Sequence, residues 1–151
     1  MNPSTLPPET PTDRPMPTDA DLQDIRALFL RQCAAESAHD LRVLDDVLLR
    51  SPPGEADPVA FVARAYTFWG RDALLEHFRT LFEGVWIMEP DETLLRVIPI
   101  GPDTAHIYAP CRVTVGELDK PPATANYLIN EFAVRTPEGW KISTMVPVPT
   151  R

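Results

Sequence analysis

Four consecutive runs in the second half of the chain have the composition of β-strands, and they restrict the possible folds more than any other feature. The runs are rich in β-branched and aromatic residues and span residues 92–100, 104–115, 124–135 and 140–148. Short turn sequences, GPD, GELDKPP and TPEG, separate them. Strands joined by short turns pair as antiparallel neighbours. This half of the chain is therefore predicted to form an antiparallel sheet.

Helical periodicity dominates the first half. A helix is predicted from about residue 19 to 38 behind the N-cap Thr18, because apolar side chains recur there every three or four residues: Leu22, Ile25, Phe29 and Cys33. A shorter helix follows within residues 40–50 and ends at SPPGEADP. Residues 59–68 are predicted to form one strand, and a third helix is predicted from about 71 to 83. The order indicates an α+β fold, an antiparallel sheet with the helices on one face.

The strand predicted at 104–115 has two different faces. One carries small apolar side chains suited to packing under the helices, namely Ala105, Ile107, Ala109, Cys111 and Val113. The other carries larger amphipathic side chains and is expected to face solvent or a partner subunit: His106, Tyr108, Pro110, Arg112 and Thr114. A proline in mid-strand, Pro110, predicts a bulge or bend there and hence a curved sheet.

Length and charge limit the class of protein. A chain of 151 residues corresponds to one domain, and we expect it at 19–151 behind a flexible, proline-rich arm at 1–18. The chain has 14 basic and 22 acidic residues, which argues against nucleic acid or an anionic membrane as partner. It has no apolar run typical of a signal peptide or of a membrane span, so a cytoplasmic location is expected. Cys33 and Cys111 are expected to be buried free thiols.

Three segments carry a resemblance to a known family. They are GRDALLEHFRTLFEG, beginning at Gly70, then VIPIGPDTAHIYA with Gly101 to Ala105 at its centre, and EGWKIS with Gly139 and Trp140. From about residue 19 to the end, the chain resembles the SnoaL-like branch of the nuclear-transport-factor-2-like superfamily. Within that branch it is most similar to the small SgcJ/EcaC-type proteins, some of which occur with polyketide and enediyne antibiotic biosynthesis.

The resemblance implies a cystatin-like cone, in which a curved sheet wraps around three helices and encloses a pocket. It also implies a homodimer formed through the outer face of the sheet. Relatives include ketosteroid isomerases, polyketide cyclases, dehydratases and epoxide hydrolases, and others only bind or assemble. The fold therefore does not decide the function.

Acid–base groups are the first candidates for chemistry in such a pocket, because burial raises the pKa of a carboxyl group. Glu131 lies in a strand of apolar residues, and it is a candidate only if it points inward with Tyr127 and Ile129. We expect it to point outward as an exposed or interface charge. Asn130 has the opposite parity, so one of the two should face the pocket. His77, on the flank of the third helix, is a weaker catalytic candidate, and local packing is its more expected role. It is also predicted, with Tyr66 and Trp69, at the rim of the pocket.

Aromatic residues around the third helix could line the mouth of the pocket or fill the core, and the sequence leaves both open: Tyr66, Trp69 and Trp86. Trp140 is expected to be structural. The last strand ends in VPVP, which predicts an apolar end to the pocket. We expect no metal and no cofactor, because the histidines lack ligand spacing and no nucleotide-binding motif is present.

Two functions remain open. The chain could be a pocket protein of secondary metabolism that binds a hydrophobic polyketide-like intermediate, with cofactor-free cyclisation, dehydration or isomerisation as its chemistry. The alternative is a non-catalytic binding or dimerisation module with an incidental cavity. An enclosed cavity above about 300 Å³ with an inward carboxyl, Tyr or His would favour the first function. The sequence identifies neither the ligand nor a reaction.

Overall fold

The computed structural model of the chain describes residues 14–150, so most of the predicted arm lies outside the described residues. Three helices and seven strands follow one another in this part of the chain: α1 (Asp19–Ser37), α2 (Leu41–Val47), β1 (Ala60–Val62), β2 (Thr67–Trp69), α3 (Arg71–Leu81), β3 (Val85–Pro90), β4 (Arg96–Gly101), β5 (Thr104–Gly116), β6 (Ala123–Thr136) and β7 (Gly139–Pro149).

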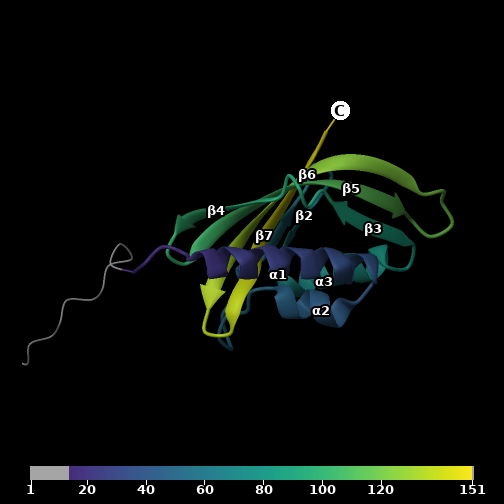
Figure 1. Cartoon of the computed structure of the whole chain (residues 1–151). Coiled ribbons are helices and arrows are strands. Elements are labelled where there is room, and N and C mark those ends of the chain that lie inside the picture. Colours follow the sequence, from purple (N-terminus) through teal and green to yellow (C-terminus); the bar gives the residue numbers. More distant parts are fainter. Residues whose placement is uncertain (1–13, 151) are drawn as a thin grey trace, which may run out of the picture.

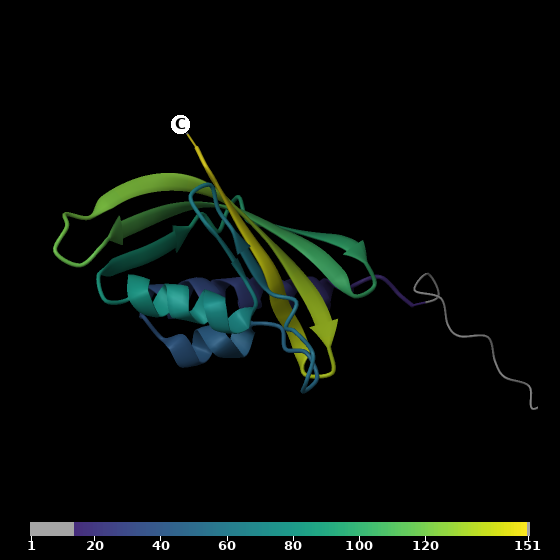
Figure 2. The same cartoon turned by 180° about the vertical axis from the view of Figure 1, so that it is seen from behind.

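A curved sheet arches over the helices, which all lie on its concave side (Figures 1 and 2). The strands are ordered β2-β1-β7-β6-β5-β3, and β4 also pairs with β5. The inward residues predicted for β5 are all buried, while the opposite face of that strand is more exposed. The predicted α+β cone with helices on one face is thus confirmed.

Two details of the predicted sheet were wrong. The segment 59–68 forms two short antiparallel strands, β1 and β2, because the chain turns back where Ala63 N–H donates to the Tyr66 carbonyl at 3.0 Å. The sheet is also not wholly antiparallel, since β1 runs parallel to β7. The strands β1 and β7 are far apart in the sequence, so no short hairpin forces them to pair in antiparallel fashion.

Strand β3 was missing from the predicted elements. Its side chains alternate between buried and exposed, with Trp86 and Met88 pointing inward. The strands β3 and β4 share one edge of β5, and Pro110 lies between the two paired segments. Its missing N–H therefore leaves no gap in a ladder, and the pairing of β5 with β6 runs through it without a shift. Of the predicted bulge or bend at Pro110, the register excludes the bulge, whereas the curved sheet predicted from this proline is confirmed (Figures 1 and 2).

The irregularities lie elsewhere, and the one between β6 and β7 matters for the interior. Ala133 pairs with Ile142 and Glu131 with Met145, so β7 advances three residues where β6 advances two. One extra residue in β7 changes which of its side chains face inward. Beyond this bulge, Met145 and then the two prolines of the VPVP run face the interior.

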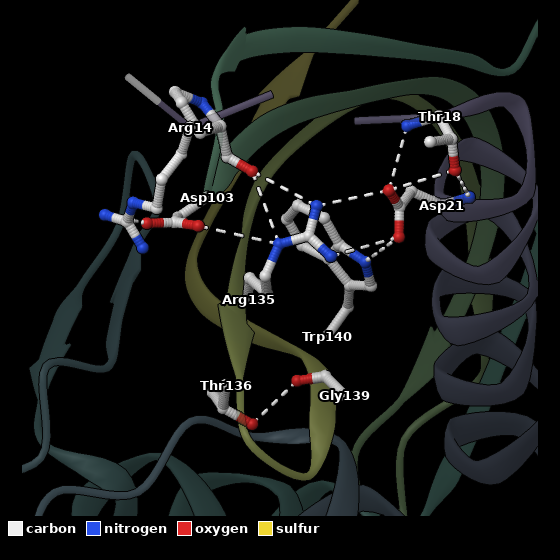
Figure 3. A network of polar contacts seen from close by, with 9 residues as sticks. Arg14, Thr18, Asp21, Asp103, Arg135, Thr136, Gly139 and Trp140 are labelled. Carbon is white, nitrogen blue, oxygen red and sulfur yellow. Dashed lines mark hydrogen bonds and ion pairs between the residues drawn. The ribbon is translucent and has the colours of Figure 1, made fainter. Parts of the chain in front are cut away.

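The start of α1 is tied to the sheet by a polar network (Figure 3). The guanidinium of Arg135 donates to both carboxylate oxygens of Asp21 at 3.1 Å and lies 4.6 Å from the centre of the Trp140 ring. Asp21 also closes the capping box of α1 with Thr18. The Arg135 hydrogen bonds hold the pKa of Asp21 well below its usual range. Trp140 is structural here, as predicted.

Buried apolar side chains from α1, α2, α3 and the concave face of the sheet form one continuous core. Cys33 and Cys111 belong to it as free thiols, as expected. Among the described residues, no helix combines the length and the apolar character needed to cross a membrane.

Two glycines shape the ends of α3. Gly70 precedes the helix with φ of +93°, a conformation that residues with a β-carbon rarely adopt. Gly84 follows the helix and lies against the end of β5, where an added β-carbon would be 1.9 Å from the carbonyl oxygen of Gly116.

We predict that Gly84→Ala lowers the free energy of unfolding by about 1–3 kcal/mol, because backbone must move to relieve the clash with Gly116. Urea unfolding followed by circular dichroism measures the change. Gly101→Ala is the matched control, since an added β-carbon there meets nothing within 4 Å. Equal stability of the two variants would contradict the close approach.

Candidate functional site

A cavity of about 140 Å³ lies between α1 and the concave face of the sheet. Its walls are mostly apolar and come from β3, β5, β6 and β7, with Met88, Val113 and Ile129 among them. The connection between β1 and β2 lines it from the side. Its volume is below the roughly 300 Å³ that we expected for a ligand-binding pocket, so that part of the expectation is not met, whereas the expected inward carboxyl groups and tyrosine are present.

Helix α1 contributes two polar side chains to this cavity. Gln32 and Glu36 follow Ile25 and Phe29 at helical spacing, so all four lie on the face that the helix turns toward the sheet. Gln32 is 1% exposed and Glu36 is 2% exposed. Buried polar side chains of this kind are retained only where partners or neutralisation offset the loss of hydration.

The third polar side chain is Glu131 on β6, which is 1% exposed. It shares the inward parity of Tyr127 and Ile129, and all three line the cavity. The expectation that Glu131 points outward was wrong. Its neighbour Asn130 points outward instead, and there it accepts a 2.9 Å hydrogen bond from the ring N–H of His106.

One amide joins the two carboxyl groups. The Nε2 of Gln32 donates to Oε2 of Glu131 at 2.8 Å and to Oε2 of Glu36 at 2.9 Å. The indole N–H of Trp86 donates to the other oxygen of Glu36 at 3.2 Å. Glu36 thus receives two hydrogen bonds and Glu131 receives one.

Burial raises the pKa of both carboxyl groups. The pKa of Glu36 rises to about 7, since the loss of hydration outweighs the hydrogen bonds from Gln32 and Trp86. The pKa of Glu131 rises well above its ordinary value, first through burial and then through the negative charge of Glu36. Near neutral pH, Glu131 is therefore the protonated partner and Glu36 the one that exchanges its proton.

Two polar atoms at the closed end have no hydrogen-bond partner among the described residues, Oε1 of Glu131 and Oε1 of Gln32. Buried polar atoms are rarely left unpaired in folded proteins. As a protonated carboxyl, Glu131 can donate from this free oxygen. The end of the cavity thus offers a carboxylate, a carboxylic acid and an amide carbonyl to a bound molecule.

The mouth of the cavity lies at the turn between β1 and β2. Arg64, Ala65 and Tyr66 line the cavity there and are exposed to solvent. Partial burial is the main cause that raises the pKa of Tyr66. A basic residue, Arg64, and an aromatic residue, Tyr66, therefore lie at the entrance, whereas the carboxyl groups of Glu36 and Glu131 are buried inside.

The predicted pocket residues separate into two groups. Tyr66, Trp86 and Glu131 line the cavity. The other three do not. Trp69 is 72% exposed on the edge strand β2. Asn130 lies on the outer face, and His77 packs its ring against Tyr66 and Phe68 at centroid distances of 4.7 and 4.4 Å.

The position of His77 follows from α3, which turns its flank toward the β1–β2 hairpin and not toward the cavity. Partial burial in this aromatic cluster lowers the pKa of His77. The expectation that it packs locally agrees with these contacts. Within residues 14–150, no three His, Cys, Asp or Glu side chains gather as a metal ion would require.

Sequence reasoning missed Gln32 and Glu36. A signal was present, because both interrupt the apolar stripe of α1 that Ile25, Phe29 and Cys33 define. A polar residue on a buried stripe must be partnered or functional. Met145 was missed for another reason, because no sequence pattern indicates the bulge in β7 that turns its side chain inward.

No protein-family model and no curated protein matches the sequence. Solved structures do share its fold. A proposed dehydratase of the NTF2-like family from Streptomyces avermitilis aligns with a TM-score of 0.74 and 19% identity, over 87% of this chain and 97% of that one. A proposed aromatic ring hydroxylase from Novosphingobium aromaticivorans aligns at 0.76 with 18% identity, over 89% and 92%.

A ketosteroid isomerase-like protein from Erwinia carotovora atroseptica aligns with a TM-score of 0.70 and 15% identity, over 89% of this chain and 99% of that one. Other neighbours are named as cystatin-like folds. The chain therefore has the NTF2-like, cystatin-like fold that its sequence motifs predicted. At these identities, the similarity extends to the fold and not to the reaction.

We predict that the free energy of unfolding falls as the pH rises from 5 to 8. An unfolded glutamate loses its proton near pH 4.3, whereas burial keeps the folded carboxyls protonated to about pH 7 for Glu36 and higher for Glu131. Between the unfolded and the folded pKa of each carboxyl group, that group lowers the free energy of unfolding by about 1.4 kcal/mol per pH unit. Glu131→Gln should flatten this fall and be more stable than the wild type at pH 8.

Urea unfolding at pH 5, 6, 7 and 8 measures the slope for both proteins. Glu138→Gln is the matched control, because Glu138 is exposed in the turn between β6 and β7. Parallel curves for Glu131→Gln and the wild type would show that Glu131 is ionised in the folded protein across this range.

Proposed function

We propose that the protein is a cofactor-free acid–base enzyme that moves a proton on the carbon next to a carbonyl group. The observation that carries this proposal is the pair of buried carboxyls at the closed end of an apolar cavity, joined by Gln32 and held at different pKa values. Two titratable groups whose environments separate their pKa values can act as base and acid at the same pH.

In the proposed reaction, the carboxylate of Glu36 takes the proton from the α-carbon. The electrons of that C–H bond form the enolate, and its oxygen accepts a hydrogen bond from the protonated Glu131. Return of the proton from Glu36 to the same or a conjugated carbon completes an exchange or an isomerisation. A base with a pKa near the working pH is suited to this step. The hydrogen-bond donor to the enolate is placed in a site with little water, where it stabilises charge best.

Gln32 and Trp86 are positioning residues in this proposal. Their N–H groups favour the charged form of Glu36 and so offset part of the effect of burial on its pKa. Gln32 also holds Glu131 beside Glu36. Burial first, and then the charge of Glu36, raise the pKa of Glu131 and keep this acid neutral. The dehydratase and isomerase names of neighbours with this fold are consistent with such chemistry.

The finer assignment, a SnoaL-like protein of polyketide or enediyne biosynthesis acting on a hydrophobic intermediate, rests on the sequence resemblance. Cyclisation and dehydration of such intermediates also proceed through proton removal next to a carbonyl. The cavity volume of about 140 Å³ supports entry of one part of such a molecule. The alternative, a binding module without catalysis, is supported by the small volume and separates from the enzyme in the following test.

We expect the wild type to accelerate exchange of the α-protons of cyclohexanone in D₂O, with the rate rising as the pH passes about 7 and Glu36 ionises. Glu36→Gln should lower the rate by about 10²-fold or more, because the base is lost. Proton NMR of the ketone measures the exchange. Asn130→Ala, on the outer face of the sheet, is the control and should keep the wild-type rate.

Equal rates for the wild type and Glu36→Gln would contradict the enzyme proposal. A thermal shift with ring ketones or polyene extracts, in the absence of exchange or turnover, would assign the protein to the binding-module alternative.

We also propose that the partner is a second copy of the chain, joined through the outer face of the sheet. That face exposes apolar side chains of β4 and β7, with Ile98 at 42%, Ile100 at 59% and Val148 at 42% exposure. Exposed apolar side chains on the face of a sheet are compatible with an interface. Ile98→Lys should convert a dimer into a monomer in light-scattering measurements, and Leu118→Lys, in the β5–β6 turn, should not.

A further inference from the structure

The charges that line the cavity are divided between its two ends. Glu36 and Glu131 lie buried at the closed end, and Arg64 is the single basic residue among the described side chains that line it. Arg64 is exposed at the mouth, in the turn between β1 and β2. It takes part in none of the ion pairs formed within residues 14–150. Its guanidinium is therefore not committed to an ion pair with another described residue.

The volume restricts what can lie between these ends. A dry apolar cavity of about 150 Å³ in another protein binds one molecule of benzene. A cavity of about 140 Å³ thus accepts one six-membered ring or an acyl chain of similar size. Most of its wall is apolar, with Phe61, Trp86 and Met145 contributing flat or flexible surface.

The net charge of the chain is a second reason to expect an anionic ligand at Arg64. The chain carries a formal net charge of −8, which repels anions from most of its surface. An anionic ligand needs a local cation at the entrance, whereas a neutral ligand does not. An exposed arginine at the mouth, with no ion-pair partner among residues 14–150, fits an anionic group on the ligand.

We propose that the substrate is a carbonyl compound with a single ring, or a short acyl chain, that carries an anionic group at the end opposite the carbonyl. The carbonyl oxygen lies at Glu131 and the anionic group lies outside the mouth at Arg64. Arg64 is thus the specificity-determining residue. This inference rests on the proposed function, because it orients the substrate by the carboxyl pair.

Isothermal titration calorimetry of the full chain with an anionic probe and its neutral ester tests the proposed role of Arg64. The first probe is 3-(4-hydroxyphenyl)propanoate, whose phenol imitates the enol of the substrate, and the second is its neutral methyl ester. At low ionic strength the wild type should bind the acid about fivefold more tightly than the ester, as expected for a solvent-accessible ion pair. At 0.5 M salt the preference should shrink. A naphthyl homologue of the acid should bind at least about tenfold more weakly, because a second ring overfills the cavity.

Arg64→Gln should bind acid and ester equally and keep the wild-type affinity for the ester. Arg42→Gln is the matched control, since Arg42 is an exposed arginine on α2 away from the cavity, and it should keep the preference. A preference that persists in Arg64→Gln, or naphthyl binding as tight as that of the single ring, would overturn the inference.

The failure of this inference differs from the failure of the proposed function. Glu131→Leu should weaken both probes by about the same factor, because leucine has no hydrogen-bond donor to offer at the closed end. If acid and ester bind the wild type equally but Glu131→Leu weakens both, only the role of Arg64 is lost. If neither probe binds the wild type, or Glu131→Leu changes neither affinity, the proposed function fails and the inference fails with it.

Discussion

The packing of α1 against the concave face of the sheet is the contact on which both the core and the cavity depend. One face of this helix supplies Ile25 and Phe29 to the core and, two turns further along, Gln32 and Glu36 to the cavity. The amide of Gln32 then reaches across to Glu131 on β6. Helix and sheet are thus joined by apolar burial at one end and by shared hydrogen bonds at the other. A change in the position of α1 would alter both.

The two ends of this contact differ in charge and in hydration. At the start of α1, Arg135 and Asp21 form an ion pair that remains accessible to solvent and that stacks on Trp140. Further along, the carboxyls of Glu36 and Glu131 are removed from water and have no cation beside them among the described residues. The ion pair that fixes the start of α1 therefore stays in contact with water, whereas the carboxyl groups that have lost their hydration line the cavity. Burying unpaired carboxyls lowers stability at neutral pH, which is the usual cost of preparing an acid and a base in a folded protein.

Much of the fold followed from the sequence, and the exceptions have physical causes. The alternation in β5 and the helical stripe of α1 both set the buried faces correctly, because each follows the period of its own element. Strand β3 was missed although Trp86 and Met88 alternate with exposed residues, since it follows α3 directly after a single glycine turn. The direction of β1 depends on its pairing with β7, which is distant in the sequence, and no local sequence pattern indicates that pairing.

The candidate site was predictable only in part. The apolar strand around Glu131 showed that a carboxyl there would matter if it pointed inward, but parity alone allows either face to be the inner one. Asn130 and Glu131 exchange roles if the sheet curves the other way. Curvature brings the face with Glu131 over α1 and leaves Asn130 to pair with His106 outside. The same curvature separates Trp69 from the cavity and keeps Trp86 in it.

By itself, the sequence determined the class of fold, the three helices, the four strands β4 to β7 and the N-cap of α1, because these depend on local periodicity and turn chemistry. Only the tertiary structure decided that Gln32, Glu36 and Glu131 meet at one end of a cavity. These residues are separated by up to 99 positions, and their hydrogen bonds exist only after the helix is buried against the sheet. The shift in their pKa values has the same origin, since hydration is lost when those two surfaces close over the carboxyl groups.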